Sequence, residues 1–568
     1  MAVTQPVWSL VDEAQHADFI IQLSHGVYPV ADMTLIDPAT MQVTKSTGVY
    51  RAFYPPGSYP TPDLSDISLP PPRMSVRANA VWMQRHIWQL SHESVQTPAY
   101  YVLMVPVWWA ADRLGGPFAA IYSIRVINAL IVAALAPMAV MVARVLVPTR
   151  PVVATLAAIL AILLPGLNLN GTRISNDTLA AALGGLLVLL AVRWAGSGWT
   201  WRRAALIGLL LGVGLMVKLT LAGLLPVLAV SALWPAADSA WRGNLARFLL
   251  SAALAVVCLA PWFLLNLHIY GGATPGPRAA RLSDSVPGPL NATFVALDFV
   301  VFGLTYWTGE PWGALPFAAP FAVLGGLIAL SAPVGVVKLL RARPVSGPRG
   351  PLVVAIAAAV AMTGVALLLP AGGSFEFVGP GRYTYPALPA IAALFAIGIC
   401  TVFTRPVAQQ LVGALYAAGA IGVLGAGAAG LPPAPEPGPG TPPRDARVVS
   451  VTASGQFQGL TIDIDKIAAD QGARAMWFEV TVSNSGPREM EWTVPPIVSA
   501  DGLAAHADYL RSTHLPGDLD PGQRVTGWLF VPLDPANVHA GASIDVRFVD
   551  VAVEDYSDVQ DIVVVLKT

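Results

Sequence analysis

Long apolar runs fill the first three quarters of the chain and constrain its fold more than any other feature. A helix that crosses the hydrocarbon core of a bilayer needs about 20 mainly apolar residues. Ten segments approach or reach that length, at residues 121–143, 152–168, 177–195, 203–217, 219–235, 246–268, 317–338, 351–370, 386–404 and 408–430. Only 12% of all residues are charged, against roughly 25% in an average soluble domain. The sequence therefore predicts an all-α, polytopic domain embedded in a membrane.

The basic residues of the short loops predict how this domain is oriented. One alternating set of loops carries twelve Lys and Arg residues, and the other set carries five. Because Lys and Arg accumulate in cytoplasmic loops, the first set is expected in the cytoplasm. A multi-pass protein of the cell membrane is then expected, with residues 1–120 and the C-terminal region outside the cytoplasm. No signal peptide precedes this start, so the chain is expected to lack its first helix, which would bring the fold to eleven spans.

The C-terminal part has a different pattern. A Pro- and Gly-rich linker at residues 431–445 precedes residues 446–568, where alternating runs such as MWFEVTVSN and RVTGWLFVPL are separated by turn residues. This pattern is typical of an antiparallel β-sandwich. The predicted organisation is an outer first loop with juxtamembrane helices (1–120), a helical membrane domain (121–430) with a large outer loop (269–316), the linker, and an all-β sandwich outside the cytoplasm.

The stretch WSLVDEAQHADFI gathers acidic residues and a histidine before the first apolar span. On a helix, Asp12 lies four residues and Glu13 three residues before His16, so either carboxylate could orient the imidazole. A solvated first helical turn explains the same residues, because acidic side chains stabilise the positive end of the helix dipole. Glu93 precedes an apolar helix that starts with proline, where a polar cap is the alternative to a binding role.

Three further polar groups interrupt the outer ends of the apolar segments. Asp177 opens one segment, either as a site residue or as part of a helix cap. Lys218 separates two segments, and an ionisable group there indicates a functional site unless it extends to the lipid head groups. Arg382 and Tyr383 follow the sequence VGPG, where the arginine fork suits a phosphate and an interfacial anchor is the alternative. The net charge of −1 gives no reason to expect a nucleic-acid partner.

The order and spacing of these groups resemble the C-fold membrane glycosyltransferases over residues 8–404. The shared landmarks are a DE pair, an E-x-x-x-x-P-x-Y-Y element, an N-D pair that opens a helix, a Lys ending G-L-x-x-G-x-x-x-x-x-K, and R-Y-x-x-P. The likeness is greatest to the protein O-mannosyltransferase and aminoarabinose-transferase branch and to a related bacterial group of membrane proteins. One departure is that Gln96–Ala99 replaces the H-x-P-P of that branch.

The resemblance implies an enzyme that transfers a sugar from a polyprenyl-phosphate donor to a glycan, lipid or protein acceptor outside the cytoplasm. It assigns the catalytic carboxylate to Asp12, with Glu13 beside it. The donor phosphate would bind Lys218 and Arg382, and the other residues expected to bind substrate are His16, Glu93, Tyr100, Asp177 and Tyr383. No resident cofactor is implied, and a divalent metal is left open.

The large outer loop is expected to cover the acceptor, since Trp307, Glu310 and Trp312 suit a sugar ring. Two alternatives from other classes stay open. One is a transporter or flippase of a lipid-linked glycan, although transporters place ionisable groups near the bilayer midplane in repeated halves. The other is a non-catalytic envelope protein whose sandwich binds a glycan.

Overall fold

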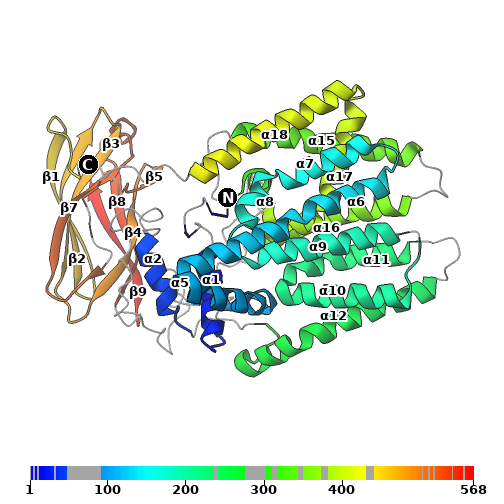
Figure 1. Cartoon of the computed structure of the whole chain (residues 1–568). Helices are drawn as coiled ribbons and strands as arrows, with labels where there is room; N and C mark the ends of the chain where they lie inside the picture. Colours follow the sequence, from blue (N-terminus) through cyan, green and yellow to red (C-terminus); the bar gives the residue numbers. More distant parts are fainter. Residues whose placement is uncertain are drawn as a thin grey trace. The chain divides into compact units, whose positions relative to one another are not determined.

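The described regular structure is helical up to residue 429 and consists mainly of strands from Arg447 onward, with one short 3₁₀ helix, η5 (Pro535–Asn537), among them (Figure 1). The computed structural model describes residues 2–3, 7–8, 12–30, 34–47, 91–195, 197–234, 241–274, 302–309, 318–342, 349–372, 381–429, 440–501, 503–508, 512–513, 515, 518–539, 541–553 and 557–567. The chain divides into two units, one of Met1–Ala31 with Ser91–Leu431 and one of Asp32–Leu90 with Pro432–Thr568.

The first unit is helical in all of its described regular structure. Its helices are α1 (Glu13–Ser24), η2 (His92–Val95), α5 (Ala99–Ala133), α6 (Leu135–Leu146), α7 (Pro151–Ile162), α8 (Pro165–Gly171), α9 (Asn176–Trp194), α10 (Trp201–Val217), η3 (Leu219–Leu224), α11 (Leu225–Leu233), α12 (Trp241–Tyr270), α15 (Ala318–Ala342), α16 (Arg349–Gly372), η4 (Gly381–Ala387), α17 (Leu388–Val402) and α18 (Pro406–Ala429). Residues 302–308 form a further short helical segment of this unit. The predicted helical domain is confirmed.

Among the described residues, fewer helices have the length and hydropathy of a span than the ten predicted. Each of the ten predicted segments coincides with one or two helices, but among the described residues seven helices have the length and hydropathy of a span. The bent pair α7 and α8 would make an eighth. The shortfall lies around Lys218, whose extended backbone (φ −159°) ends α10 after 17 residues and is followed by the 3₁₀ turn η3. A polar residue at this turn thus divides two apolar segments that the hydropathy pattern assigns to full spans.

Capping residues explain where the helices near Lys218 begin. Ser175 Oγ accepts a hydrogen bond from the Asp177 N–H (3.2 Å), which satisfies a free donor in the first turn of α9. Thr200 Oγ1 does the same for the Arg203 N–H of α10 (3.3 Å). These caps fix the start of each helix, and hence the position of the side chains in its first turn.

Two glycines divide α5. Gly115 and Gly116 have non-helical backbone angles, and φ of Gly116 is +74°, a region that glycine enters without steric cost. The part before this break contains residues 100–111, which we predict to form a juxtamembrane or re-entrant helix. It buries one side and exposes apolar side chains such as Val102 and Trp109 on the other. An exposed apolar stripe of this kind suits contact with lipid.

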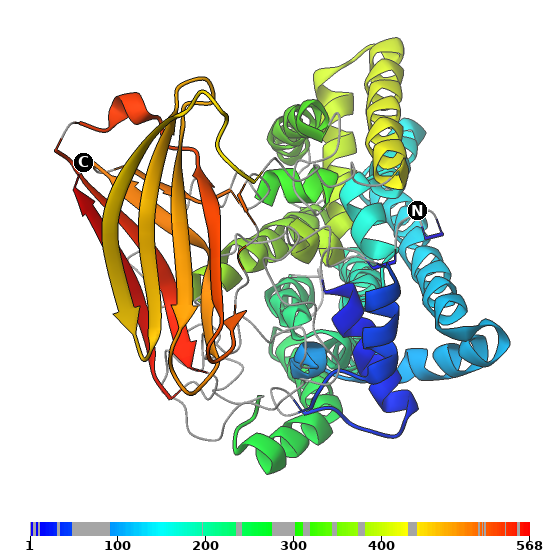
Figure 2. The same ribbon diagram turned by 90° about the vertical axis from the view of Figure 1, so that its left-hand side faces the viewer.

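The C-terminal strands form a sandwich of two antiparallel sheets (Figure 2). The strands are β1 (Arg447–Phe457), β2 (Leu460–Asp470), β3 (Ala475–Asn484), β4 (Met490–Ala500), β5 (Leu503–His506), β6 (Asp518–Leu519), β7 (Arg524–Val531), β8 (Ser543–Val553) and β9 (Val559–Lys567). One sheet has the order β1-β2-β3-β7 and the other β5-β4-β8-β9, with β6 on β4. Alternate residues of both sheets, such as Phe478 and Phe548, fill one core. The predicted β-sandwich is confirmed, and α2 (Pro38–Thr47) belongs to the same unit.

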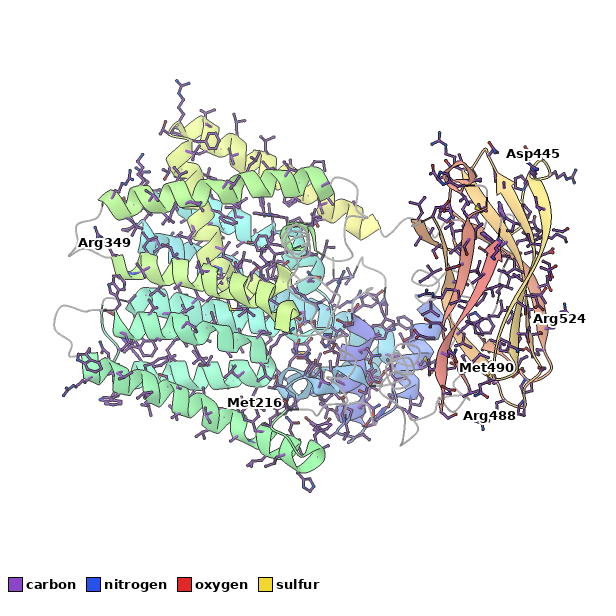
Figure 3. The ribbon with its side chains drawn as sticks, turned by 180° about the vertical axis from the view of Figure 1, so that it is seen from behind. Met216, Arg349, Asp445, Arg488, Met490 and Arg524 are labelled. Carbon is purple, nitrogen blue, oxygen red and sulfur yellow. The ribbon has the colours of Figure 1, made fainter. Side chains whose placement is uncertain are left out.

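The loops at the two ends of the helical unit differ in how many Lys and Arg residues they carry. Figure 3 shows Met216, close to the end of α10, at the opposite end of the helices from Arg349, at the start of α16. Lys218 follows Met216 by two residues and belongs to the less basic set of loops, whereas Arg349 belongs to the more basic set. The helix arrangement therefore agrees with the division of the loops on which the predicted orientation depends.

Candidate functional site

Asp12 stands immediately before α1 with its carboxylate partly open to solvent. Its backbone is left-handed (φ 51°, ψ 0°), a conformation that Asp adopts more readily than most residues. The side chain is 42% exposed and does not cap the helix. Asp12 thus presents a carboxylate that a dissolved or membrane-bound molecule can reach.

Glu13, the next residue, is completely buried. Arg125 Nε and Nη2 donate to its two carboxylate oxygens at 2.7 and 2.6 Å, and the Ile174 N–H donates to Oε1 at 3.0 Å. The carboxylate therefore ties α1 to α5 and to the segment before α9. A carboxylate held on both oxygens inside the protein is poorly placed to take a proton from a substrate. This geometry favours a structural role for Glu13 in place of the catalytic role that the sequence predicts.

Two cations and two carboxylates meet at one end of the helices. Asp177 Oδ1 forms an ion pair with Lys218 Nζ. Its Oδ2 lies 3.4 Å from Arg382 Nε. Arg382 Nη2 lies 3.7 Å from Asp12 Oδ2. Four predicted site residues that are spread over 370 positions of the sequence thus form one cluster, which we call the charge cluster (Asp12, Asp177, Lys218 and Arg382).

Tyr383 and Asn176 border the charge cluster. Lys218 Nζ lies 5.0 Å from the centre of the Tyr383 ring, within the range of a cation–π contact. Asn176 Nδ2 donates to Val217 O (3.2 Å), and Asn176 Oδ1 lies 3.5 Å from Lys218 Nζ. These contacts hold the lysine near Asp177 and place the predicted residue Tyr383 at the same site.

A close backbone contact positions Arg382. The Gly381 N–H donates to Thr305 Oγ1 (2.9 Å), and a Cβ on Gly381 would collide with the backbone of Tyr306. Only glycine permits this approach between η4 and the helical segment 302–308. The segment therefore fixes the backbone next to the arginine.

The predicted acceptor cover is not supported by the position of Trp307. This side chain is 5% exposed, and its ring packs on Phe395 (5.7 Å between ring centres) and on Tyr416 (6.2 Å). Its indole faces the interior of the helical unit, so it cannot stack on a sugar in this conformation. Glu310 and Trp312 lie outside the described residues.

His16 and Glu93 form a second polar group beside the charge cluster. His16 Nδ1 lies 3.5 Å from Glu93 Oε2 and hydrogen-bonds the Tyr101 hydroxyl at 2.7 Å. Burial raises the pKa of the Glu93 carboxyl to about 8, and the charge of Asp12 acts in the same direction. Burial also lowers the pKa of the His16 imidazole to about 4, against the opposing effect of Asp12. At neutral pH both side chains are therefore mainly uncharged.

Tyr100 does not face this group. It is completely buried, and its hydroxyl accepts a hydrogen bond from Asn128 Nδ2 (2.9 Å). The neighbouring Tyr101 contacts His16 instead. The substrate-binding role predicted for Tyr100 thus fits poorly with its position, because adjacent residues of a helix point in directions about 100° apart.

Sequence reasoning missed Arg125 and Asn128, which support the site from within α5. Arg125 binds Glu13, while Asn128 also donates to the Arg173 carbonyl at 2.5 Å. The signal was present, because Arg125 lies inside the predicted span 121–143, and an ionisable residue in a span indicates a functional or paired group. In the described part of the chain, no three His, Cys, Asp or Glu side chains converge on one point that would suit a metal ion.

Comparison with solved structures returns partial likenesses. One is an oligosaccharyltransferase from Archaeoglobus fulgidus tethered with an acceptor peptide, at 16% identity and TM-score 0.38, with 59% of this chain and 47% of that chain covered. Another is ArnT from Cupriavidus metallidurans, at 14% identity and TM-score 0.36, with 66% of this chain and 63% of that chain covered. The chain spans less than two thirds of the length of either protein.

Comparison with curated proteins finds no match. A family model, described as "Predicted membrane protein (DUF2142)", matches residues 1–391 of the 568. The match includes every residue of the charge cluster and most of the helical unit. The chain therefore belongs to the DUF2142 family of membrane proteins.

Proposed function

We propose that the chain is a glycosyltransferase that moves a sugar from a polyprenyl-phosphate donor to an acceptor hydroxyl on the outer face of the membrane. The observation that carries the proposal is the charge cluster. It combines an accessible carboxylate, Asp12, with two cations at the end of the helical unit where a lipid phosphate would lie. The order of the sequence motifs supports the same class of reaction.

Asp12 supplies the base in this proposal. Its carboxylate accepts the proton of the acceptor hydroxyl while the oxygen forms a bond to the anomeric carbon of the sugar. The bond between that carbon and the phosphate oxygen breaks, and its electron pair leaves with the phosphate. A positioned base of this kind contributes about 10²–10⁴-fold to a rate.

Lys218 and Arg382 stabilise the leaving phosphate. A phosphate leaving group needs positive charge rather than a proton, and both cations are mostly buried, where their electrostatic effect exceeds that in water. The arginine can hold two phosphate oxygens through parallel hydrogen bonds, whereas the lysine acts as a point charge.

The broken helix α7–α8 gives little support to the transporter alternative. Transporters use the free carbonyls of broken helices to bind ions. Here the Asn168 amide donates to the carbonyls of Ile162 and Leu164, at 2.8 and 2.9 Å. These two carbonyls at the break are therefore already hydrogen-bonded within the chain. The charges of the cluster gather instead at one end of the helices.

Replacing Arg382 by Lys tests the donor part of the proposal. Arg382→Lys keeps the charge but loses the planar fork, so we expect donor affinity to fall by about tenfold although the substitution looks conservative. The measurement is binding of a polyprenyl-phosphate sugar to the purified chain. Arg405→Lys, an exposed arginine outside the cluster, serves as the matched control. Unchanged donor affinity in Arg382→Lys would count against phosphate binding at this site.

The sidedness of the site can be tested with an impermeant thiol reagent on intact cells. Cysteines introduced at the exposed positions Val27 and Val449 are expected to react, because they fall outside the cytoplasm by the predicted orientation. A cysteine at Ser197, in the turn between α9 and α10, is expected to stay unlabelled. The wild-type chain measures the background from Cys258 and Cys400. The reverse pattern would place the charge cluster in the cytoplasm and remove the proposed donor pool.

A further inference from the structure

We propose that the Asp177 carboxylate is an internal counter-ion of the two phosphate-binding cations, Lys218 and Arg382. The donor phosphate displaces this carboxylate from the cations, and the carboxylate later promotes release of the lipid-phosphate product. This inference rests on the proposed function and assigns a regulatory role within the same site. It also explains why a carboxylate stands where a phosphate should bind.

The contacts of Asp177 place it at the centre of the positive groups. One carboxylate oxygen pairs with Lys218 and the other lies 3.4 Å from Arg382 Nε. Asp177 is also the second residue of the 19-residue helix α9, whose N-terminus adds partial positive charge. The carboxylate thus takes the position between the cations that an incoming phosphate would prefer.

The surrounding packing keeps these groups close together. Ser175 caps α9 at the Asp177 N–H, and α9 packs tightly on η4, where a Cβ on Gly184 would collide with Pro386. Arg382 is in that same η4 segment. Asp177 and Arg382 are therefore carried by two helices in close contact, which places the carboxylate beside the cation that a phosphate would bind.

A charge count shows what the competition does. Asp12 and Asp177 balance Lys218 and Arg382, and the buried pair of Glu13 and Arg125 adds no net charge. His16 and Glu93 are mainly uncharged at pH 7. The donor is a phosphodiester with one negative charge. The product is a phosphate monoester, whose second pKa of about 6 gives it nearly two negative charges at pH 7. Two cations without a counter-ion would hold the product more tightly than the donor. Asp177 opposes this preference, because its negative charge repels the dianionic product more strongly than the donor with its single charge.

The test compares two short lipid phosphates, farnesyl phosphate and its methyl diester, bound at pH 7 to the full chain in detergent. Asp177→Asn removes the charge and keeps the shape of the side chain. We expect this variant to bind both probes more tightly than the wild type, with the gain for the monoester exceeding the gain for the diester by about tenfold, because the dianion is repelled by one more unit of charge. In transfer assays, added farnesyl phosphate should inhibit Asp177→Asn at correspondingly lower concentration.

Three further variants separate charge from structure. Asp177→Glu keeps the charge and should retain the wild-type preference between the probes. Ser175→Ala weakens the cap of α9 without changing any charge, and it should leave that preference unchanged as well. Asp177→Ser provides a second neutral variant if Asp177→Asn does not fold.

The outcomes distinguish this inference from the proposed function. If the neutral variants bind both probes less tightly, or with an unchanged preference, Asp177 only orients Lys218 and Arg382 and the counter-ion inference is wrong. If the wild type binds neither probe, the donor class itself is wrong, and the inference falls with it.

Discussion

Asp12→Asn is expected to lower sugar transfer by at least about 10²-fold while the donor still binds. The amide keeps the size and much of the hydrogen bonding of the side chain but cannot accept the proton of the acceptor hydroxyl. Asp12 is 42% exposed and lies 3.7 Å from Arg382, so its replacement leaves the buried parts of the site in place. The measurement is turnover of the purified chain with a polyprenyl-phosphate sugar, together with donor affinity.

Glu13→Gln is the matched control for that experiment, since it makes the same chemical change one residue later. Because Glu13 is bound by Arg125, this variant is expected to lose stability first and turnover only as far as Asp12 shifts. Near-normal transfer in Asp12→Asn, with transfer abolished in a folded Glu13→Gln, would move the base to Glu13. Normal transfer in both variants would show that the charge cluster does not carry out the proposed reaction.

Arg125→Met is expected to destabilise the helical unit by about 3–5 kcal/mol, because it leaves the Glu13 carboxylate buried without its ion-pair partner. The measurement is the unfolding midpoint of the purified chain in detergent. The double variant Glu13→Leu with Arg125→Met removes the charge altogether and should recover more than half of the loss, since apolar side chains often replace a buried ion pair at little cost.

The double variant also tests whether the pair positions Asp12. Its stability should return while transfer stays low, because the hydrogen bonds from Arg125 and from the Ile174 N–H to the Glu13 carboxylate, which fix the residue next to Asp12, are then lost. If Arg125→Met is as stable as the wild type, the ion pair between Glu13 and Arg125 does not stabilise the fold. Full recovery of transfer in the double variant would show that Asp12 is positioned without it.

Much of the fold follows from short-range patterns in the sequence. Apolar runs predict the helices, and alternation predicts the strands, because each pattern reflects which face of an element is buried. The charge cluster was predictable for a related reason. Asp177, Lys218 and Arg382 each interrupt an apolar run at the same end of the helices, so the alternation of the loops already places them together.

The contacts inside the site were less predictable, because they depend on how distant helices rotate against each other. Glu13 and Arg125 are separated by 112 residues, and nothing local to either one indicates the pairing. Tyr100 and Tyr101 are neighbours in the same motif, yet only Tyr101 faces His16. Trp307 resembles a sugar-stacking residue in the sequence but packs inward on Phe395. Composition shows that such side chains are present without showing which way they turn.

The position of Arg382 also sets an order of events during synthesis of the protein. Asp12 and Glu13 leave the ribosome first, and Glu13 must wait for Arg125 before its charge is neutralised. Lys218 can pair with Asp177 as soon as α10 is made. Arg382, the group that bridges the two carboxylates, is made last, after the 302–308 segment with which the neighbouring Gly381 forms a hydrogen bond. The charge cluster is therefore complete only when the chain up to η4 has been made, so the phosphate site that we propose cannot form in a shorter chain.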